Sequence, residues 1–183
     1  MQVDTGFEGL VTERLRLRRS GPDDADQISA YRSDPRVHRY QGWDRTDPEG
    51  VRREIEEMAA RAPGEPGGWV QLTVEDRESG RLVGDVGFSP AEGEPAVIKI
   101  GYTISPAFQG RGYATEAVRA LVDYLFDTLD AGVIRAYASA ENLPSIRVAE
   151  KVGLQLEERF ERRSGGDRWY GVRFELRRDD RSL

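Results

Sequence analysis

The chain has 183 residues, with 27 Lys and Arg, 33 Asp and Glu, one His and no Cys. The net charge of −6 argues against a dedicated DNA-binding protein. The lack of Cys excludes disulfides, a zinc ribbon, an iron–sulfur cluster and a thiol nucleophile, and a single His (His38) excludes a multi-His metal site. With 38% hydrophobic and 33% charged residues, the composition is that of one folded domain that can bury a core.

The chain carries no membrane or export signal that we recognise. No segment approaches the ~18 consecutive apolar residues of a membrane span. Residues 1–10 lack the basic segment followed by an apolar one that is typical of a signal peptide. We therefore expect a cytoplasmic protein with no metal and with neither a membrane nor a nucleic acid as partner.

The first quarter of the chain predicts one strand and two helices. Apolar and polar residues alternate over Leu15–Arg18, which is typical of a strand. The acid-rich segment 22–26 suits the first turn of a helix that continues to about Ser33. Residues 36–46 are predicted as a loop, and a second helix is predicted over about 48–61.

Three strands follow, separated by short turns. They are predicted at Trp69–Val74, Leu82–Phe88 and Val97–Ile104, with turns over residues 78–80 and 89–95. Successive strands joined by such short turns indicate an antiparallel meander.

The strongest helical pattern comes next. Between Ala114 and Leu129 the apolar residues recur at the i, i+3, i+4, i+7 spacing of a buried face, and Gly132 is expected to end this helix. A strand over Val133–Ser139 and a short helix over about 144–152 follow. Two final strands flank a Gly-rich turn, at about residues 154–163 and 168–177.

This order predicts the α+β class, as one domain with a mixed, mostly antiparallel sheet of six to seven strands and about four helices. The strand–helix–strand unit over residues 97–139 requires a crossover connection, which places its two strands parallel to each other.

The segment from Gly101 to Ala117 carries the chemistry. A strand ends at Ile104, two glycines (Gly110 and Gly112) follow, and a long helix begins near Tyr113. Main-chain N–H groups in such a turn, together with the helix dipole, form an anion site suited to a pyrophosphate. A plain tight turn is the alternative. A dinucleotide-binding fingerprint is excluded because its third glycine is missing and the preceding strands form a meander.

The run Gln109-Gly110-Arg111-Gly112-Tyr113-Ala114 resembles the acyl-CoA signature of the GCN5-related N-acetyltransferase (GNAT) superfamily, Gln/Arg-x-x-Gly-x-Gly/Ala. Further segments are similar to its ribosomal-protein-alanine acetyltransferase-like (RimJ/RimL-type) branch. They are residues 10–18, 34–37, 101–102, 112–117, 142–145 and 151–154. The resemblance covers roughly residues 10–178 of a single domain over 1–183.

The resemblance implies an acetyl-CoA-dependent N-acetyltransferase that acts directly on a primary amine, either a protein N-terminus or a small amine, in a ternary complex. It implies a V-shaped separation of two strands, in which pantetheine lies like an added strand. The implied cofactor site comprises Tyr102, Thr103, Ile104, Gln109, Gly110, Arg111, Gly112, Tyr113, Ala114, Thr115, Asn142 and Ser145. A helix cap is the alternative role for Asn142, the only Asn in the chain, and the two roles are compatible.

Without Cys, direct attack of the amine on the thioester is favoured over an acyl-enzyme. The resemblance implies that the Ile104 N–H stabilises the developing oxyanion. Many family members place a Tyr proton donor where this chain has Ala149, so Ser145 is the candidate donor to the leaving thiolate. An ordinary first-turn Ser is the alternative. Tyr102 and Tyr113 are second choices.

The sequence predicts no single general base. Lys99 stands where related sequences often carry Glu. Asp85 could reach the site, although a solvated outward face is the alternative for it. Glu161, His38 or a water molecule are further candidates.

Tyr40 and Trp43 are expected to wall the acceptor entrance, with core packing as the alternative for Trp43. A non-catalytic acyl-CoA-binding module of the same fold is the competing functional hypothesis, and a structural α+β domain without cofactor is the third. The C-terminal hairpin could form the edge of a homodimer.

Overall fold

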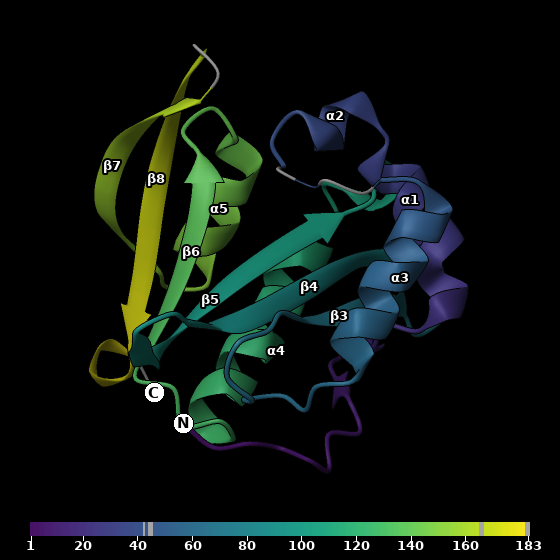
Figure 1. Ribbon diagram of the computed structural model, residues 1–183, viewed down its shortest axis with the longest axis horizontal. Coiled ribbons are helices and arrows are strands. Elements are labelled where there is room, and N and C mark those ends of the chain that lie inside the picture. Colours follow the sequence, from purple (N-terminus) through teal and green to yellow (C-terminus); the bar gives the residue numbers. More distant parts are fainter. Residues whose placement is uncertain (42, 44–45, 165–166, 182–183) are drawn as a thin grey trace.

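The computed structural model describes residues 1–41, 43, 46–164 and 167–181, and its strands form one sheet with helices on both sides (Figure 1). The N-terminal third contains β1 (Leu10–Val11), β2 (Leu15–Arg19), α1 (Ala25–Arg32), α2 (Pro35–His38) and α3 (Pro48–Ala59). A short 3-10 turn over Pro22–Asp24 leads into α1.

The rest of the chain supplies most of the sheet. The elements are β3 (Val70–Asp76), β4 (Leu82–Ala91), β5 (Glu94–Ile104), α4 (Tyr113–Asp127), β6 (Val133–Ser139), α5 (Leu143–Lys151), β7 (Gln155–Ser164) and β8 (Asp167–Arg177), with 3-10 turns at Pro106–Phe108 and Arg178–Asp180.

The strand order is β1-β2-β3-β4-β5-β6-β8-β7. The β5–β6 pair is parallel, and the other neighbouring strands of this order pair antiparallel. The predicted α+β class, the meander and the parallel crossover are therefore confirmed. The described part contains eight strands rather than six or seven, because β1 adds a two-residue strand, and five α-helices rather than four.

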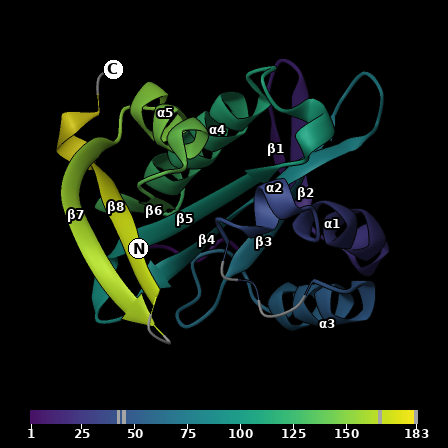
Figure 2. The ribbon, with the colours of Figure 1, turned by 90° about the horizontal axis from the view of Figure 1, so that it is seen from above.

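The helices divide into two layers. Figure 2 shows α4 and α5 on one side of the sheet and α1, α2 and α3 on the other. The larger core lies between the sheet and α4, with Leu72, Ile98 and Leu121 fully buried. A smaller core joins α1 and α3 through Ile28 and Ile55. We call the sheet surface opposite α4 and α5 the outer face.

Three local expectations were wrong. Residues 35–38 form α2 rather than loop, because Pro35 occupies the first helical turn and the Asp34 carboxylate accepts the Arg36 N–H at 2.9 Å. The expected 89–95 turn is shorter, since β4 runs to Ala91 and β5 starts at Glu94. Helix α4 ends at Asp127, five residues before Gly132.

No helix among the described residues is long and apolar enough to cross a membrane.

Candidate active site

The site begins where β5 and β6 stop pairing. Their parallel register runs from Val97↔Val133 to Ile100↔Ala136 and goes no further. Residues 101–104 of β5 and 137–139 of β6 therefore do not pair with each other. We call this opening the fork; it is the V-shaped separation that the family resemblance predicts. Main-chain groups left unpaired between two strands are what an extended ligand requires for hydrogen bonding.

A glycine turn connects the fork to α4. Gly110 and Gly112 have φ angles of +78° and +82°, in the left-handed region where a side chain is strained. A Cβ atom on Gly110 would meet nothing within 4 Å, so the space above this turn is open. The predicted turn and helix start are both present.

The start of α4 offers main-chain donors. The first intrahelical bond runs from the Glu116 N–H to the Gly112 carbonyl at 3.1 Å, so the amides of Tyr113, Ala114 and Thr115 precede the helical ladder. Gln109 and Arg111 in the turn are exposed. The Gln109 side-chain amide donates to the Ile104 carbonyl at 2.8 Å, which ties the turn to the end of β5. This arrangement suits an anion.

Arg14, which sequence reasoning missed, lies against the same turn. Its guanidinium donates to the Arg111 carbonyl at 3.0 Å, pairs with Glu116 at 2.6 Å and lies 4.8 Å from the centre of the Tyr113 ring. An open cavity of about 870 Å³ adjoins it, and Gly112, Arg119 and Lys151 are among its lining residues. In the sequence, the positive charge of Arg14 is the only sign of a role at the glycine turn, because about a hundred residues separate the two.

A hydrogen-bonded pair joins the two sides of the fork on the α5 side. The Tyr102 hydroxyl donates to the Ser145 carbonyl at 2.7 Å, and the Ser145 hydroxyl donates to the Tyr102 oxygen at 3.1 Å. Burial raises the pKa of Tyr102 to about 12. The Ser145 hydroxyl is thus held by Tyr102, and the two groups form one polar unit.

Asn142 caps α5, which is one of the two roles predicted for it. Its side-chain oxygen accepts the Ser145 N–H at 3.3 Å. Tyr113 donates its hydroxyl to Asp76 at 2.8 Å, at the end of β3.

The outer face of the fork holds a buried carboxyl. Asp85 on β4 is opposite Thr103 on β5, and its carboxylate accepts a hydrogen bond from the Tyr31 hydroxyl of α1. Asp85 is only 7% exposed, so the solvated outward face considered for it is wrong. Burial raises the pKa of Asp85 to about 6, although nearby Arg32 and the Tyr31 hydrogen bond act in the opposite direction.

The other candidates for the base lie in different surroundings. His38 is exposed on α2. Glu161 on β7 is 3.8 Å from Arg168 across the C-terminal hairpin. Lys99 lies on β5, two residues before the fork opens. Of these groups, only Asp85 combines burial, a raised pKa and a position beside the fork.

The segment after α2 approaches the outer face of the fork. The Gln41 side-chain amide donates to the Thr103 hydroxyl at 3.4 Å. Trp43 lies against the buried guanidinium of Arg32, at 4.8 Å from the ring centre, and Tyr40 lies against Arg39. Packing is therefore one role of Trp43.

Similarity to known proteins identifies the family of this chain. A family profile described as an acetyltransferase (GNAT) domain matches residues 14–155. An uncharacterized N-acetyltransferase of Bacillus licheniformis, p20, is 33% identical over 151 residues, which are 82% of this chain and 84% of that protein. The chain belongs to the GNAT acetyltransferase family. It is an acyltransferase, as the glycine signature predicts.

Solved GNAT structures share the fold. An acetyltransferase of this family from Bacillus anthracis superposes with a TM-score of 0.81 at 26% identity, covering 93% of this chain and 99% of that one. Mycobacterium smegmatis RimJ, solved in complex with CoA-disulfide, has a TM-score of 0.78 at 21% identity, covering 91% and 83%. The predicted superfamily is confirmed, and the fold is also that of an enzyme from the predicted branch.

Proposed function

We propose that this GNAT protein is an acetyl-CoA-dependent N-acetyltransferase that transfers the acetyl group directly to a primary amine in a ternary complex. The observation that carries the proposal is the continuity of the fork with the glycine turn and the start of α4. A ligand with an extended arm and a diphosphate matches this layout, because the fork offers unpaired strand edges and the turn offers amides.

Three basic side chains near the turn can meet the charge of such a ligand. Arg14, Arg119 and Lys151 border the cavity next to the glycine turn, whose lining also includes the acidic residues Glu13, Glu116, Asp123 and Asp127. Each can neutralise phosphate oxygens, and Arg14 already contacts the turn carbonyl. Together with Gln109, Gly110, Arg111 and the amides of residues 112–115, they form the proposed cofactor site; Tyr102, Thr103, Ile104, Asn142 and Ser145 complete it at the fork.

Acetyl-CoA supplies the thioester. The amine nitrogen attacks its carbonyl carbon, a C–N bond forms, and the C–S bond breaks as the thiolate leaves. The Ile104 N–H stabilises the negative charge on the carbonyl oxygen. The amine gives up its proton to a base. The Ser145 hydroxyl, which lies 3.1 Å from the Tyr102 oxygen, transfers its proton to the leaving thiolate and is reprotonated from water.

Asp85 is the base in this proposal. A carboxylate with a pKa of about 6 is ionised at neutral pH and is still a stronger base than an ordinary Asp. An α-amino group has a pKa near ~8 and a Lys side chain near ~10.4, so an N-terminus or a similarly weak base is the easier acceptor to deprotonate. Burial of Asp85 beside Thr103 supports this assignment.

Acetyl-CoA with a panel of amines, peptides and aminoglycosides, read as free thiol release, tests the proposal. We expect amine-dependent CoA release and a higher melting temperature with acetyl-CoA. Tight CoA binding without turnover across the whole panel would instead support the non-catalytic binding module. Absence of any stabilisation by acetyl-CoA or CoA would contradict both.

A further inference from the structure

The outer face of the fork has an aromatic border on each side. Gly101 and Tyr137 are the first residues of β5 and β6 beyond the last parallel pair. They follow Lys99 and Arg135 by two residues, and this pair is in register, so all four positions face the same way. Thr103 and Asp85 lie on this face as well. Because the proposed base Asp85 lies on this face, a group attached to the reacting amine would leave the fork between the two borders.

Trp69 forms the border on the β4–β5 side. A Cβ atom on Gly87 would lie 2.3 Å from the Trp69 ring nitrogen, and one on Gly101 would lie 3.2 Å from its Cη2 atom. Two facing glycines thus make the space for the edge of this indole on the sheet. Trp69 also packs against the smaller core, which fixes the ring beside the opening.

Three aromatic rings form the border on the β6–β8 side. Phe160 and Trp169 have ring centres 5.7 Å apart, and Tyr137 is 6.1 Å from Phe160 in an edge-to-face arrangement. Both Phe160 and Trp169 stand over Gly171, where a Cβ atom would come within 2.5 Å of each ring. Tyr137 and Trp169 remain 42% and 37% exposed, so this cluster presents apolar surface.

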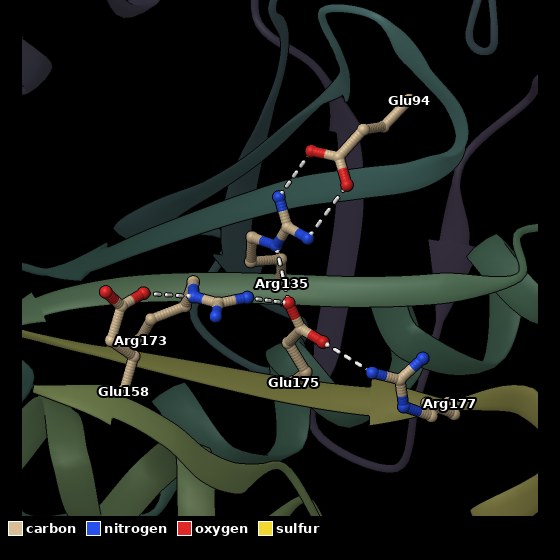
Figure 3. Close-up of polar contacts among 6 residues, drawn as sticks. All are labelled: Glu94, Arg135, Glu158, Arg173, Glu175 and Arg177. Carbon is tan, nitrogen blue, oxygen red and sulfur yellow. Dashed lines mark hydrogen bonds and ion pairs between the residues drawn. The ribbon is translucent and has the colours of Figure 1, made fainter.

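Six charged side chains close to this border already pair with one another. Glu94, Arg135, Glu175, Arg173, Glu158 and Arg177 form one connected set across β5, β6, β8 and β7, which we call the ion ladder (Figure 3). Lys99 has no ion-pair partner among the residues that the structure describes. Among the residues that the structure describes, this border therefore offers, apart from Asp85, aromatic surface and the cation of Lys99, rather than spare carboxylates that would bind several ammonium groups.

From this we infer that the acceptor is a monoamine whose neighbouring group is apolar or aromatic, held between Trp69 and the Tyr137–Phe160–Trp169 cluster, and that polycationic amines are poor substrates. The inference rests on the proposed function, since it names the substrate class of the same site. An aromatic group seated between rings gains contact energy, whereas a second ammonium would meet the cation of Lys99, for which the described part of the chain provides no counter-charge.

Matched acceptors test it, with free thiol release as the readout. The set is a tripeptide amide starting with Phe, the same peptide starting with Ser, 2-phenylethylamine and spermidine. We expect kcat/KM to be at least about tenfold higher for the Phe peptide than for the Ser peptide, and lowest for spermidine. Efficient use of 2-phenylethylamine would identify a small arylalkylamine as sufficient; use of the Phe peptide alone would identify a peptide. Both support the aromatic class.

Variants separate this inference from the function itself. Trp169→Ala and Tyr137→Ala should reduce the preference for Phe over Ser by about three- to tenfold, mainly through KM. Tyr170→Ala is the matched control, because Tyr170 is exposed on the same strand but alternates to the opposite face. Unchanged stabilisation by CoA would show that each variant retains its fold.

Equal use of Ser and Phe peptides, a preference for spermidine, or variants that leave selectivity unchanged would each overturn the inference while leaving acetyl transfer intact. No thiol release with any amine, despite binding of CoA, would overturn the proposed function and this inference with it.

Discussion

Asp85 is a carboxyl group that the fold buries next to an opening in the sheet. Its pKa of about 6 arises from burial, and one hydroxyl, from Tyr31, contacts it directly. A group in this state can exchange protons near neutral pH, where an ordinary Asp has already lost its proton.

Asp85→Asn should lower the rate of acetyl transfer by about 10²–10⁴-fold, because the base is lost, while the affinity for acetyl-CoA is unchanged.

In the wild type, kcat should fall as pH drops below about 6, because Asp85 becomes protonated. Pre-steady-state thiol release between about pH 5 and 8 measures this. Tyr31→Phe should move the acid limb to higher pH, because the Tyr31 hydrogen bond lowers the pKa of Asp85.

An Asp85→Asn protein that retains full activity, or a wild-type profile without an acid limb near pH 6, would exclude Asp85 as the base.

The same residue predicts an effect on stability. The folded-state pKa of Asp85 lies above its unfolded value of 3.8, so the folded protein binds the proton more tightly. The contribution of Asp85 to the free energy of unfolding therefore falls as pH rises from about 4 to 6, by up to about 3 kcal/mol, and is not regained above that range. Urea unfolding should show Asp85→Asn to be more stable than the wild type at pH 7, with the difference smallest near pH 4. An equal difference at both pH values would mean that the ionisation of Asp85 is not its cause.

Ser145 makes a separate residue-scale prediction. Its hydroxyl donates to Tyr102, and its N–H is capped by Asn142, so the helix start would survive loss of the hydroxyl. Ser145→Ala should lower kcat by at least about tenfold and change the dissociation constant of acetyl-CoA by less than about twofold. Ser145→Thr, which keeps a hydroxyl, is the matched control. If Ser145→Ala turns over at the wild-type rate, the residue serves only the start of α5.

At the scale of elements, the strand–turn–helix unit over residues 101–127 depends on two glycines. Gly112→Val places a branched side chain at a φ of +82°, with its Cβ atom 3.4 Å from the Arg14 guanidinium and beside the amides of α4. We expect CoA binding to weaken by more than about 100-fold, which calorimetric titration would measure.

Gly93→Val is the control for backbone strain. Gly93 also has a positive φ, of +73°, but lies in the β4–β5 turn with open space around its Cβ position. It should lose stability as Gly112→Val does, yet keep its affinity for CoA. Equal affinity in the two variants would count against an anion site at Gly112.

The elements themselves were mostly predictable, for a local reason. The turn and α4 follow from glycine placement and from apolar residues at helical spacing, and β6 follows from a short segment that is mostly apolar; each signal lies within the element. Helix α2 was missed because four residues are too few for a periodic pattern, although Asp34-Pro35 held the capping signal. The β4–β5 turn was placed too widely because Gly, Pro and Glu also occur within strand ends.

At the scale of the whole molecule, the site depends on contacts that the sequence does not display. Asp85 is buried because α1 brings Tyr31 to it across 54 residues. Arg14 reaches the glycine turn across 97 residues. The resemblance to a known family supplied the expected roles of the turn, Asn142 and Ser145, since these belong to shared motifs. It could not supply the burial of Asp85 or the aromatic borders of the fork, because they result from this chain's own packing.

The ion ladder is also a property of the whole sheet, since it connects the strands on both sides of the base of the fork. Glu175 lies at its centre, 4% exposed, and accepts hydrogen bonds from Arg135, Arg173 and Arg177. Glu175→Gln keeps the shape but removes the charge, which leaves three guanidinium groups around a neutral amide. We expect the free energy of unfolding to fall by about 3 kcal/mol, as when one partner of a buried ion pair is lost.

Glu158→Gln removes a carboxylate at the outer end of the same ladder, where Glu158 is half-exposed and pairs with Arg173 at 3.0 Å. Solvent screens this pair, so the loss should be below about 1 kcal/mol. Guanidinium would mask ion pairs, so unfolding in urea at low and at high salt is the appropriate measurement. High salt should reduce the effect of Glu158→Gln and leave most of that of Glu175→Gln, because burial limits screening. Equal losses in the two variants would mean that the ladder acts as separate surface pairs, rather than as a unit that holds β6, β7 and β8 against β5.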